Sequence, residues 1–223
     1  MKFMPRLLFI TSLVFASAFA DPITYDVSLD TSSLVGSVAG PFWLDFELTD
    51  GSATGDGNNT GVLSDFQFGS GGAIGSPISD GGASGDVLTE VMLIDSSAFG
   101  NGLDEMFTPG NSLSFQLQLS TNVDAGGADS FSFSILDSTF TPLPTTAGFP
   151  IDALAVINID NSVSPTVETF AGDTSRSIAA GGNPIAIAAP VIAIVSADVP
   201  EPSALPLLLI GLAAIATKRR VLG

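Results

Sequence analysis

Apolar and polar residues alternate strictly in four stretches of this chain, and this alternation limits what the chain can fold into. Residues 23–30 have the sequence ITYDVSLD, and residues 42–48 have the sequence FWLDFEL. The same period of two runs through residues 112–120 and residues 130–135. Because successive side chains of a β-strand point to opposite faces, each stretch predicts a strand with one buried and one solvated face. Such half-buried strands are typical of antiparallel sheets.

Shorter apolar runs and polar turns complete this pattern. Clusters such as DGSATGDGNNTG and GSGGAIGSPISDGG separate the runs and indicate turns. Leu103–Phe107 is expected to form at most one helical turn. The pattern predicts an all-β fold, with a single β-sandwich or jelly-roll-like domain; a β-helix is the alternative, although no fixed repeat period is present. Five further strands are predicted, near Leu63–Phe68, Val87–Ile94, Ala153–Ile159, Ile185–Ala188 and Val191–Val195.

Residue types that are missing from the chain exclude several kinds of chemistry. The sequence has no cysteine, so no disulfide braces the fold, and no histidine, which excludes Ser–His and Cys–His catalysis and imidazole zinc sites. No lysine lies between Asp21 and Asp198, and neither a G-x-S-x-G nor a G-x-G-x-x-G motif occurs. We therefore predict that the protein is not an enzyme.

Acidic residues dominate the same stretch. All but one of the 23 acidic residues lie between Asp21 and Asp198, where Arg176 is the single cation. This balance disfavours binding to nucleic acid and to anionic lipid headgroups. It favours cationic partners, calcium above all. The alternative is that the acidic residues only keep the protein soluble, because negatively charged molecules repel one another. Arg176 lies close to Asp173 in the sequence and is expected to make only a local ion pair.

The N-terminus has the pattern of a secretory signal peptide. Two cations precede an apolar run over residues 7–19, and the small residues Ala18 and Ala20 form an A-x-A cleavage site. We therefore predict that residues 1–20 are a signal peptide and that an extracytoplasmic β-rich domain occupies residues 21–198.

The C-terminus combines a Pro-Glu-Pro segment, an apolar run over residues 204–217 and the cations Lys218, Arg219 and Arg220. As a helix the run spans about 21 Å at ~1.5 Å per residue, against a hydrocarbon core of about 30 Å. The terminal cations can reach an interface, so the run predicts a short transmembrane helix with its basic end in the cytoplasm. A core helix or a helix lying on the membrane are the alternatives.

These features together resemble the PEP-CTERM sorting tail of Gram-negative bacteria, and residues 199–223 are assigned to it. The motif itself comprises Val199, Pro200, Glu201, Pro202 and Ser203. The resemblance implies that exosortase, a membrane cysteine transpeptidase, processes the tail near the Pro-Glu-Pro segment. An inner-membrane intermediate would then precede transfer to the cell surface, outer envelope or extracellular matrix. The same tail occurs on many unrelated exported proteins, so it implies an address and not an activity.

The domain before the tail is similar to uncharacterised ectodomains that carry such tails, notably in the stretches DPITYDVSLDTSSL and FTPGNSLSFQLQLSTNVDAGG. This similarity implies fold and location only. We accordingly expect a non-catalytic component of the cell envelope or of an exopolysaccharide or biofilm matrix.

One candidate sugar contact lies on the second alternating stretch. Asp45 and Glu47 share the outer face of this predicted strand with Trp43. A flat aromatic ring beside carboxylates suits contact with a sugar, and glycoside hydrolysis needs two carboxylates, so a carbohydrate-active enzyme is the alternative function. An ordinary solvated strand face, with Trp43 covered by a loop, accounts for the same residues.

One candidate calcium site lies in the glycine-rich loop that follows. Asp50, Asp56, Asn58 and Asn59 could supply several of the six to eight oxygen ligands that calcium prefers. The loop departs from the EF-hand pattern, and a solvated hairpin loop is the alternative. No cofactor other than calcium is expected.

Overall fold

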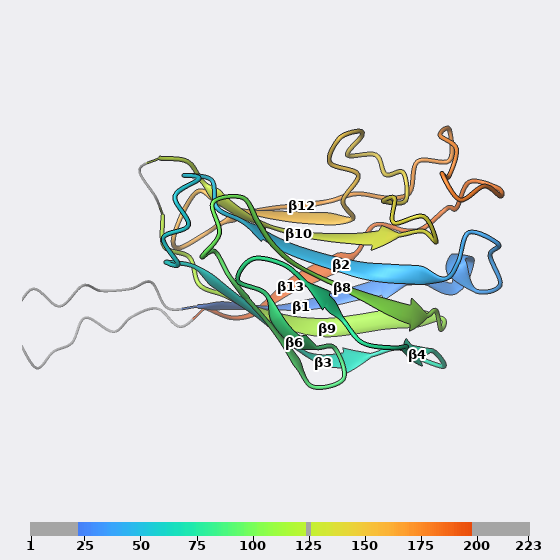
Figure 1. Cartoon of the computed structure of the whole chain (residues 1–223), viewed down its shortest axis with the longest axis horizontal. Helices are drawn as coiled ribbons and strands as arrows, with labels where there is room; N and C mark the ends of the chain where they lie inside the picture. Colours follow the sequence, from blue (N-terminus) through green and yellow to red (C-terminus); the bar gives the residue numbers. More distant parts are fainter. Residues whose placement is uncertain (1–21, 124–125, 198–223) are drawn as a thin grey trace, which may run out of the picture.

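The computed structural model describes residues 22–123 and 126–197, which form two antiparallel β-sheets (Figure 1). The part of the chain so described contains no α-helix and one short 3-10 helix, η1 (Ser32–Leu34). It also holds no helix of the length and apolar character needed to cross a membrane. The predicted signal peptide with its cleavage residues Ala18 and Ala20, and the predicted tail with its helix over residues 204–217, lie outside the described residues.

Sheet A has the strand order β13-β1-β9-β3-β7-β6. Its strands are β1 (Ile23–Asp30), β3 (Thr60–Gln67), β6 (Ser84–Asp86), β7 (Glu90–Ile94), β9 (Ser112–Leu119) and β13 (Val191–Ala197).

Sheet B has the order β12-β11-β10-β2-β8-β4, and β5 also pairs with β8. Its strands are β2 (Phe42–Thr49), β4 (Gly72–Ala73), β5 (Ile78–Ser79), β8 (Gly100–Thr108), β10 (Asp129–Leu136), β11 (Ala155–Ile159) and β12 (Thr166–Thr169). The chain crosses repeatedly between the sheets: β1, β3, β7, β9 and β13 lie in sheet A, whereas β2, β8 and β10 lie in sheet B.

The core lies between the two sheets and is built from the apolar members of the alternating strands. A cluster of four phenylalanines joins them: Phe46 from sheet B contacts Phe115 and Phe66 from sheet A, and Phe133 from sheet B contacts Phe115. The ring of Phe115 lies 5.4 Å from that of Phe46 and 5.2 Å from that of Phe66. Packing of this kind explains why strict alternation specified these strands, since one face of each is removed from water.

The structure confirms the all-β prediction as two packed antiparallel sheets, and it corrects two details. Leu103–Phe107 is not a helical turn but part of β8. Ile185–Ala188 is not a strand, although Ile187 is buried against the core. The predicted strand near Val191–Val195 is present as β13.

The first and the last strand of the described chain bring its two termini to the same end of the sandwich. Ile23 at the start of β1 pairs with Ala197 at the end of β13. The β2–β3, β7–β8 and β9–β10 connections share this end, because Gly61, Leu119 and Leu93 follow in register across sheet A. We call it the tail end, since the predicted sorting tail continues from Ala197; the opposite end is the distal end.

Candidate functional site

A small acidic pocket lies on the outer face of sheet B. Asp45 on β2 is the direct cross-strand partner of Asp104 on β8, and Glu47 is the partner of Gly102. The pocket has a volume of about 210 Å³. Gly100 and Gly102 have no side chain to fill it. The residues that line this acidic pocket are Asp45, Glu47, Ile78, Ser79, Asp80, Gly100, Gly102 and Asp104.

Two carboxyl groups in the acidic pocket resist ionisation. Burial raises the pKa of Asp45 to about 7, and the charges of Asp104 and Glu47 add to the effect. Burial and the charge of Glu47 also raise the pKa of Asp104. Its Oδ1 atom is buried and has no hydrogen-bond partner among the residues that the structure describes. The pocket therefore places a carboxyl group that can be protonated near neutral pH beside further acidic side chains.

Trp43 lies on the same strand but outside the lining of the acidic pocket. Its ring packs on Phe140, with ring centroids 4.4 Å apart. Phe140 belongs to a turn held by the buried Asp137, whose Oδ1 accepts hydrogen bonds from the N–H of Thr139 at 2.8 Å and from its hydroxyl at 2.6 Å. The structure thus brings Asp45 and Glu47 together in one pocket. Trp43, the third residue of the predicted sugar contact, lies outside this pocket and is partly covered by the loop that carries Phe140.

The predicted calcium loop lies at the tail end, and hydrogen-bond donors of the protein already engage Asp50, Asp56 and Asn59. Asp50 is buried, and its carboxylate accepts hydrogen bonds from the N–H groups of Ser52 at 2.7 Å and Thr54 at 3.1 Å. Burial alone would raise the pKa of Asp50, but the hydrogen bonds from Ser52 and Gly55 outweigh it and lower the value.

The other predicted calcium ligands differ in exposure. Asn59 is buried, and its Oδ1 accepts hydrogen bonds from the N–H of Asn122 at 2.8 Å and from the hydroxyl of Ser120 at 3.2 Å. Asp56 is exposed and Asn58 is half-buried. Within residues 22–123 and 126–197, no group of three or more acidic, histidine or cysteine side chains is arranged to hold a metal ion. Calcium binding here stays a prediction.

A second carboxyl pair at the tail end was not predicted. Asp95 and Asp129 are both buried, and Asn59 contacts both: its backbone N–H donates to the Asp95 carboxylate at 3.1 Å, and its Nδ2 donates to Asp129 at 2.6 Å. Burial, together with the hydrogen bond and charge of Asp129, raises the pKa of Asp95 despite the N–H of Asn59. The pair ties the end of β7 in sheet A to the start of β10 in sheet B.

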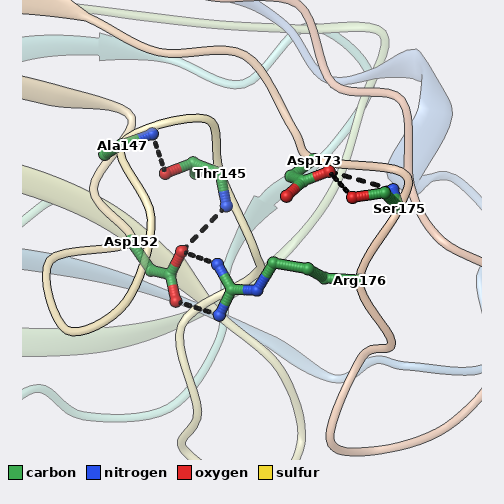
Figure 2. A network of polar contacts seen from close by, with 6 residues as sticks. All are labelled: Thr145, Ala147, Asp152, Asp173, Ser175 and Arg176. Carbon is green, nitrogen blue, oxygen red and sulfur yellow. Dashed lines mark hydrogen bonds and ion pairs between the residues drawn. The ribbon is translucent and has the colours of Figure 1, made fainter.

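Arg176 makes its ion pair with Asp152, not with Asp173 (Figure 2). The two guanidinium nitrogens meet the two carboxylate oxygens, Nη2 to Oδ2 at 2.7 Å, and the N–H of Thr145 adds a hydrogen bond to Oδ1 at 3.0 Å. Burial raises the pKa of Asp152, but these contacts outweigh it and hold the value below its usual range. Asp173 accepts hydrogen bonds from Ser175 instead. This network closes the distal end, joining the β10–β11 and β12–β13 connections.

Sequence comparison assigns the C-terminus. Residues 198–220 match the family model described as the PEP-CTERM protein-sorting motif, which covers the predicted motif residues 199–203 and the basic residues 218–220. Neither a curated protein nor a solved structure matches the chain. The motif supports export, processing by exosortase and sorting towards the cell surface. The chain therefore carries a PEP-CTERM protein-sorting motif directly behind its β-sandwich.

Proposed function

We propose that this protein is an exported, non-catalytic component of the cell envelope or of an exopolysaccharide matrix in a Gram-negative bacterium. The observation that carries this proposal is the sorting motif at residues 198–220, which begins immediately after β13. A signal peptide over residues 1–20 would start export, and the tail would hold the folded sandwich at the membrane until exosortase processes it.

Within this function, the acidic pocket is the surface that we assign to ligand contact. Its volume of about 210 Å³ lies below the ~300–1,000 Å³ typical of pockets that enclose small molecules. A shallow pocket on a sheet face suits one polar unit of a longer polymer. Carboxylates accept hydrogen bonds from sugar hydroxyls, so an exopolysaccharide chain is the ligand that this chemistry fits best. No bound metal is needed for this contact.

A carbohydrate-active enzyme is the second candidate, and the pKa of Asp45 is the observation that favours it. At about 7, this pKa allows Asp45 to donate a proton near neutral pH. Glycoside hydrolases combine one acid and one carboxylate in this way. Glu47 would then be the second carboxylate.

Binding and cleavage assays separate the two candidates. The exported protein should bind exopolysaccharide from its host and release no reducing ends. Gly102→Val should weaken binding about tenfold or more, because a side chain at this position enters the pocket. A Cβ atom there would have its nearest contact at 3.4 Å and would meet no clash. Glu90→Gln, which removes an exposed charge from sheet A, is the matched control and should bind normally. Release of reducing ends that disappears in Asp45→Asn would overturn the non-catalytic proposal.

A further inference from the structure

The four edges of the two sheets differ in how well they are protected from pairing with another strand. β6 has three residues and contains Gly85 and Asp86, β4 has two residues, and β12 has four residues and carries Glu168. β13 is seven residues long, with the sequence VIAIVSA, and has neither charge nor proline. Short length and charge are the usual protections of an edge strand, and β13 lacks both.

The free edge of β13 also exposes apolar side chains. Val191 is 67% exposed, Ile194 is 59% exposed and Val195 is 54% exposed. Among residues 22–123 and 126–197, β13 pairs with β1 alone, on one side. The pairing is regular over Val191–Ile194, and the register shifts at Val195, between the partners of Tyr25 and Thr24. A regular ladder of unpaired backbone groups therefore coincides with exposed apolar surface.

Charge selects the partner. No acidic residue lies between Asp173 and Asp198, although the chain has 23 acidic residues in total. Two copies of such an acidic protein repel each other over most approaches. β13 itself carries no charge, so a second copy that approaches along this edge meets no acidic side chain on the strand itself.

The sequence of β13 suits pairing with itself. Val191-Ile-Ala-Ile-Val195 is a palindrome centred on Ala193. In an antiparallel pair of identical strands centred on this residue, Ile192 of one copy lies opposite Ile194 of the other. Within one copy, Ile192 is the cross-strand partner of Val27 on β1 and Ile194 is the partner of Tyr25. The side chains of Val27 and Tyr25 face the core, so Ile192 and Ile194 lie on the same face of the sheet. The pairing would thus cover Ile194 on the core side.

We infer that the free edge of β13 pairs antiparallel with β13 of a second copy, centred on Ala193, so that the two copies of sheet A form one continuous sheet. The two-fold axis passes through Ala193, and the interface is the same surface on both copies. This inference concerns self-association and does not depend on the ligand assigned to the acidic pocket.

Site-specific disulfide formation tests this inference in the full chain, which has no cysteine of its own. Directly opposed residues of an antiparallel pair have Cα atoms about 4.5–5.5 Å apart, within the range that a disulfide needs. Full-length Ala193→Cys in detergent should form a disulfide-linked dimer roughly tenfold or more faster than Glu168→Cys, which places the thiol on the exposed edge strand β12. Adding Ile194→Lys to Ala193→Cys should reduce the rate to that of the control, with an unchanged circular dichroism spectrum.

Salt gives an independent readout. The dimer fraction of the unmodified chain should rise with ionic strength, because screening weakens the repulsion between acidic copies. Equal crosslinking rates at the two positions would overturn the inference. The inference would also be overturned if the chain were monomeric and the Ala193→Cys thiol were still shielded from a maleimide in host cells. In that case a different protein would cover the edge.

Discussion

Asp152 and Asp95 show, at the scale of single residues, how the same side chain takes opposite roles in this acidic protein. Asp152 accepts hydrogen bonds from Arg176 and from the N–H of Thr145, and its pKa is lowered. Asp95 is buried beside Asp129, and its pKa is raised. The first group stabilises the fold when ionised, and the second when protonated, so the two respond to pH with opposite signs.

We expect Asp95→Asn to stabilise the protein at alkaline pH. The folded pKa of Asp95 lies above the unfolded value of 3.8, so the folded chain keeps a proton that the unfolded chain loses, and stability falls as pH rises from about 4 towards 7. An asparagine keeps the contacts with Asn59 and Asp129 without a proton to lose. Urea unfolding should show a gain of about 1–2 kcal/mol at pH 8 and almost none near pH 4. Asp65→Asn, at an exposed position, is the control; a similar gain at both pH values would contradict the expectation.

We expect Arg176→Gln to destabilise the distal end. Asp152 is 7% exposed, so loss of the guanidinium leaves a largely buried carboxylate with too few donors. Because Arg176 is partly exposed, the loss of stability at pH 7 should be measurable but smaller than that from breaking a fully buried ion pair. The pKa of Asp152 is lowered in the folded chain, so this stabilisation is present above the unfolded value of 3.8 and is lost as pH falls through the folded value. The difference between the variant and the parent should therefore shrink towards pH 2, and a pH-independent difference would argue against the ion pair.

At the scale of elements, alternation predicted β1, β2, β9 and β10 because one face of each is uniformly apolar. β8 was missed because its inward-facing positions include Asn101 and Glu105. Distant backbone groups contact both polar side chains: Asn101 Nδ2 donates to the carbonyl of Leu48 at 3.0 Å, and the N–H of Val87 donates to Glu105 Oε2 at 2.9 Å. Such partners come from tertiary structure, and local patterns do not contain them.

The candidate site was predictable to the same extent. The alternation in β2 placed Asp45 and Glu47 on one outer face, as the structure has them. Asp104 completes the acidic pocket through the pairing of β2 with β8, which lies far along the chain. Likewise, Asp95 directly follows β7 of sheet A and Asp129 begins β10 of sheet B, and only the packing of those sheets brings them together.

We expect Gly51→Ala to separate two connections at the tail end. A Cβ atom at this position would lie 2.1 Å from the carbonyl oxygen of Ala128, so the β2–β3 and β9–β10 connections are in direct backbone contact. The N–H of Gly51 also donates to Asp129 at 2.8 Å. The substitution should cost about 1–3 kcal/mol in thermal or urea unfolding. Gly72→Ala, where a Cβ meets nothing within 4 Å, is the control, and equal stability of the two variants would contradict the contact.

At the scale of the whole molecule, the position of the chain ends bears on orientation. Ile23 and Ala197 are paired at the tail end. Residues 198–203 lie between β13 and the apolar run, and when extended they reach no more than about 20 Å. We therefore expect the tail end to face the membrane while the tail is intact, with the distal end and its Arg176–Asp152 network directed away from it.

The net charge predicts that cations raise the melting temperature by general screening and not through a specific site. With all but one of the 23 acidic residues in the exported domain, the folded protein repels itself, and cations should raise its melting temperature. Because Asp50 and Asn59 are engaged by protein donors, sodium at equal ionic strength should replace calcium. A response to calcium below 1 mM at fixed ionic strength, lost in Asp56→Ala, would instead establish a specific site. The comparison requires only melting curves with EDTA, calcium and sodium chloride.

Mass spectrometry of the protein recovered from the surface of its native host tests most directly whether the tail is processed. Because the sorting motif covers residues 198–220 and processing is expected near the Pro-Glu-Pro segment, peptides should cover the sandwich and none should extend beyond this region. Deletion of residues 204–223 should release the sandwich as a soluble exported protein. Abundant surface protein that still carries Lys218–Gly223 would contradict processing of the tail.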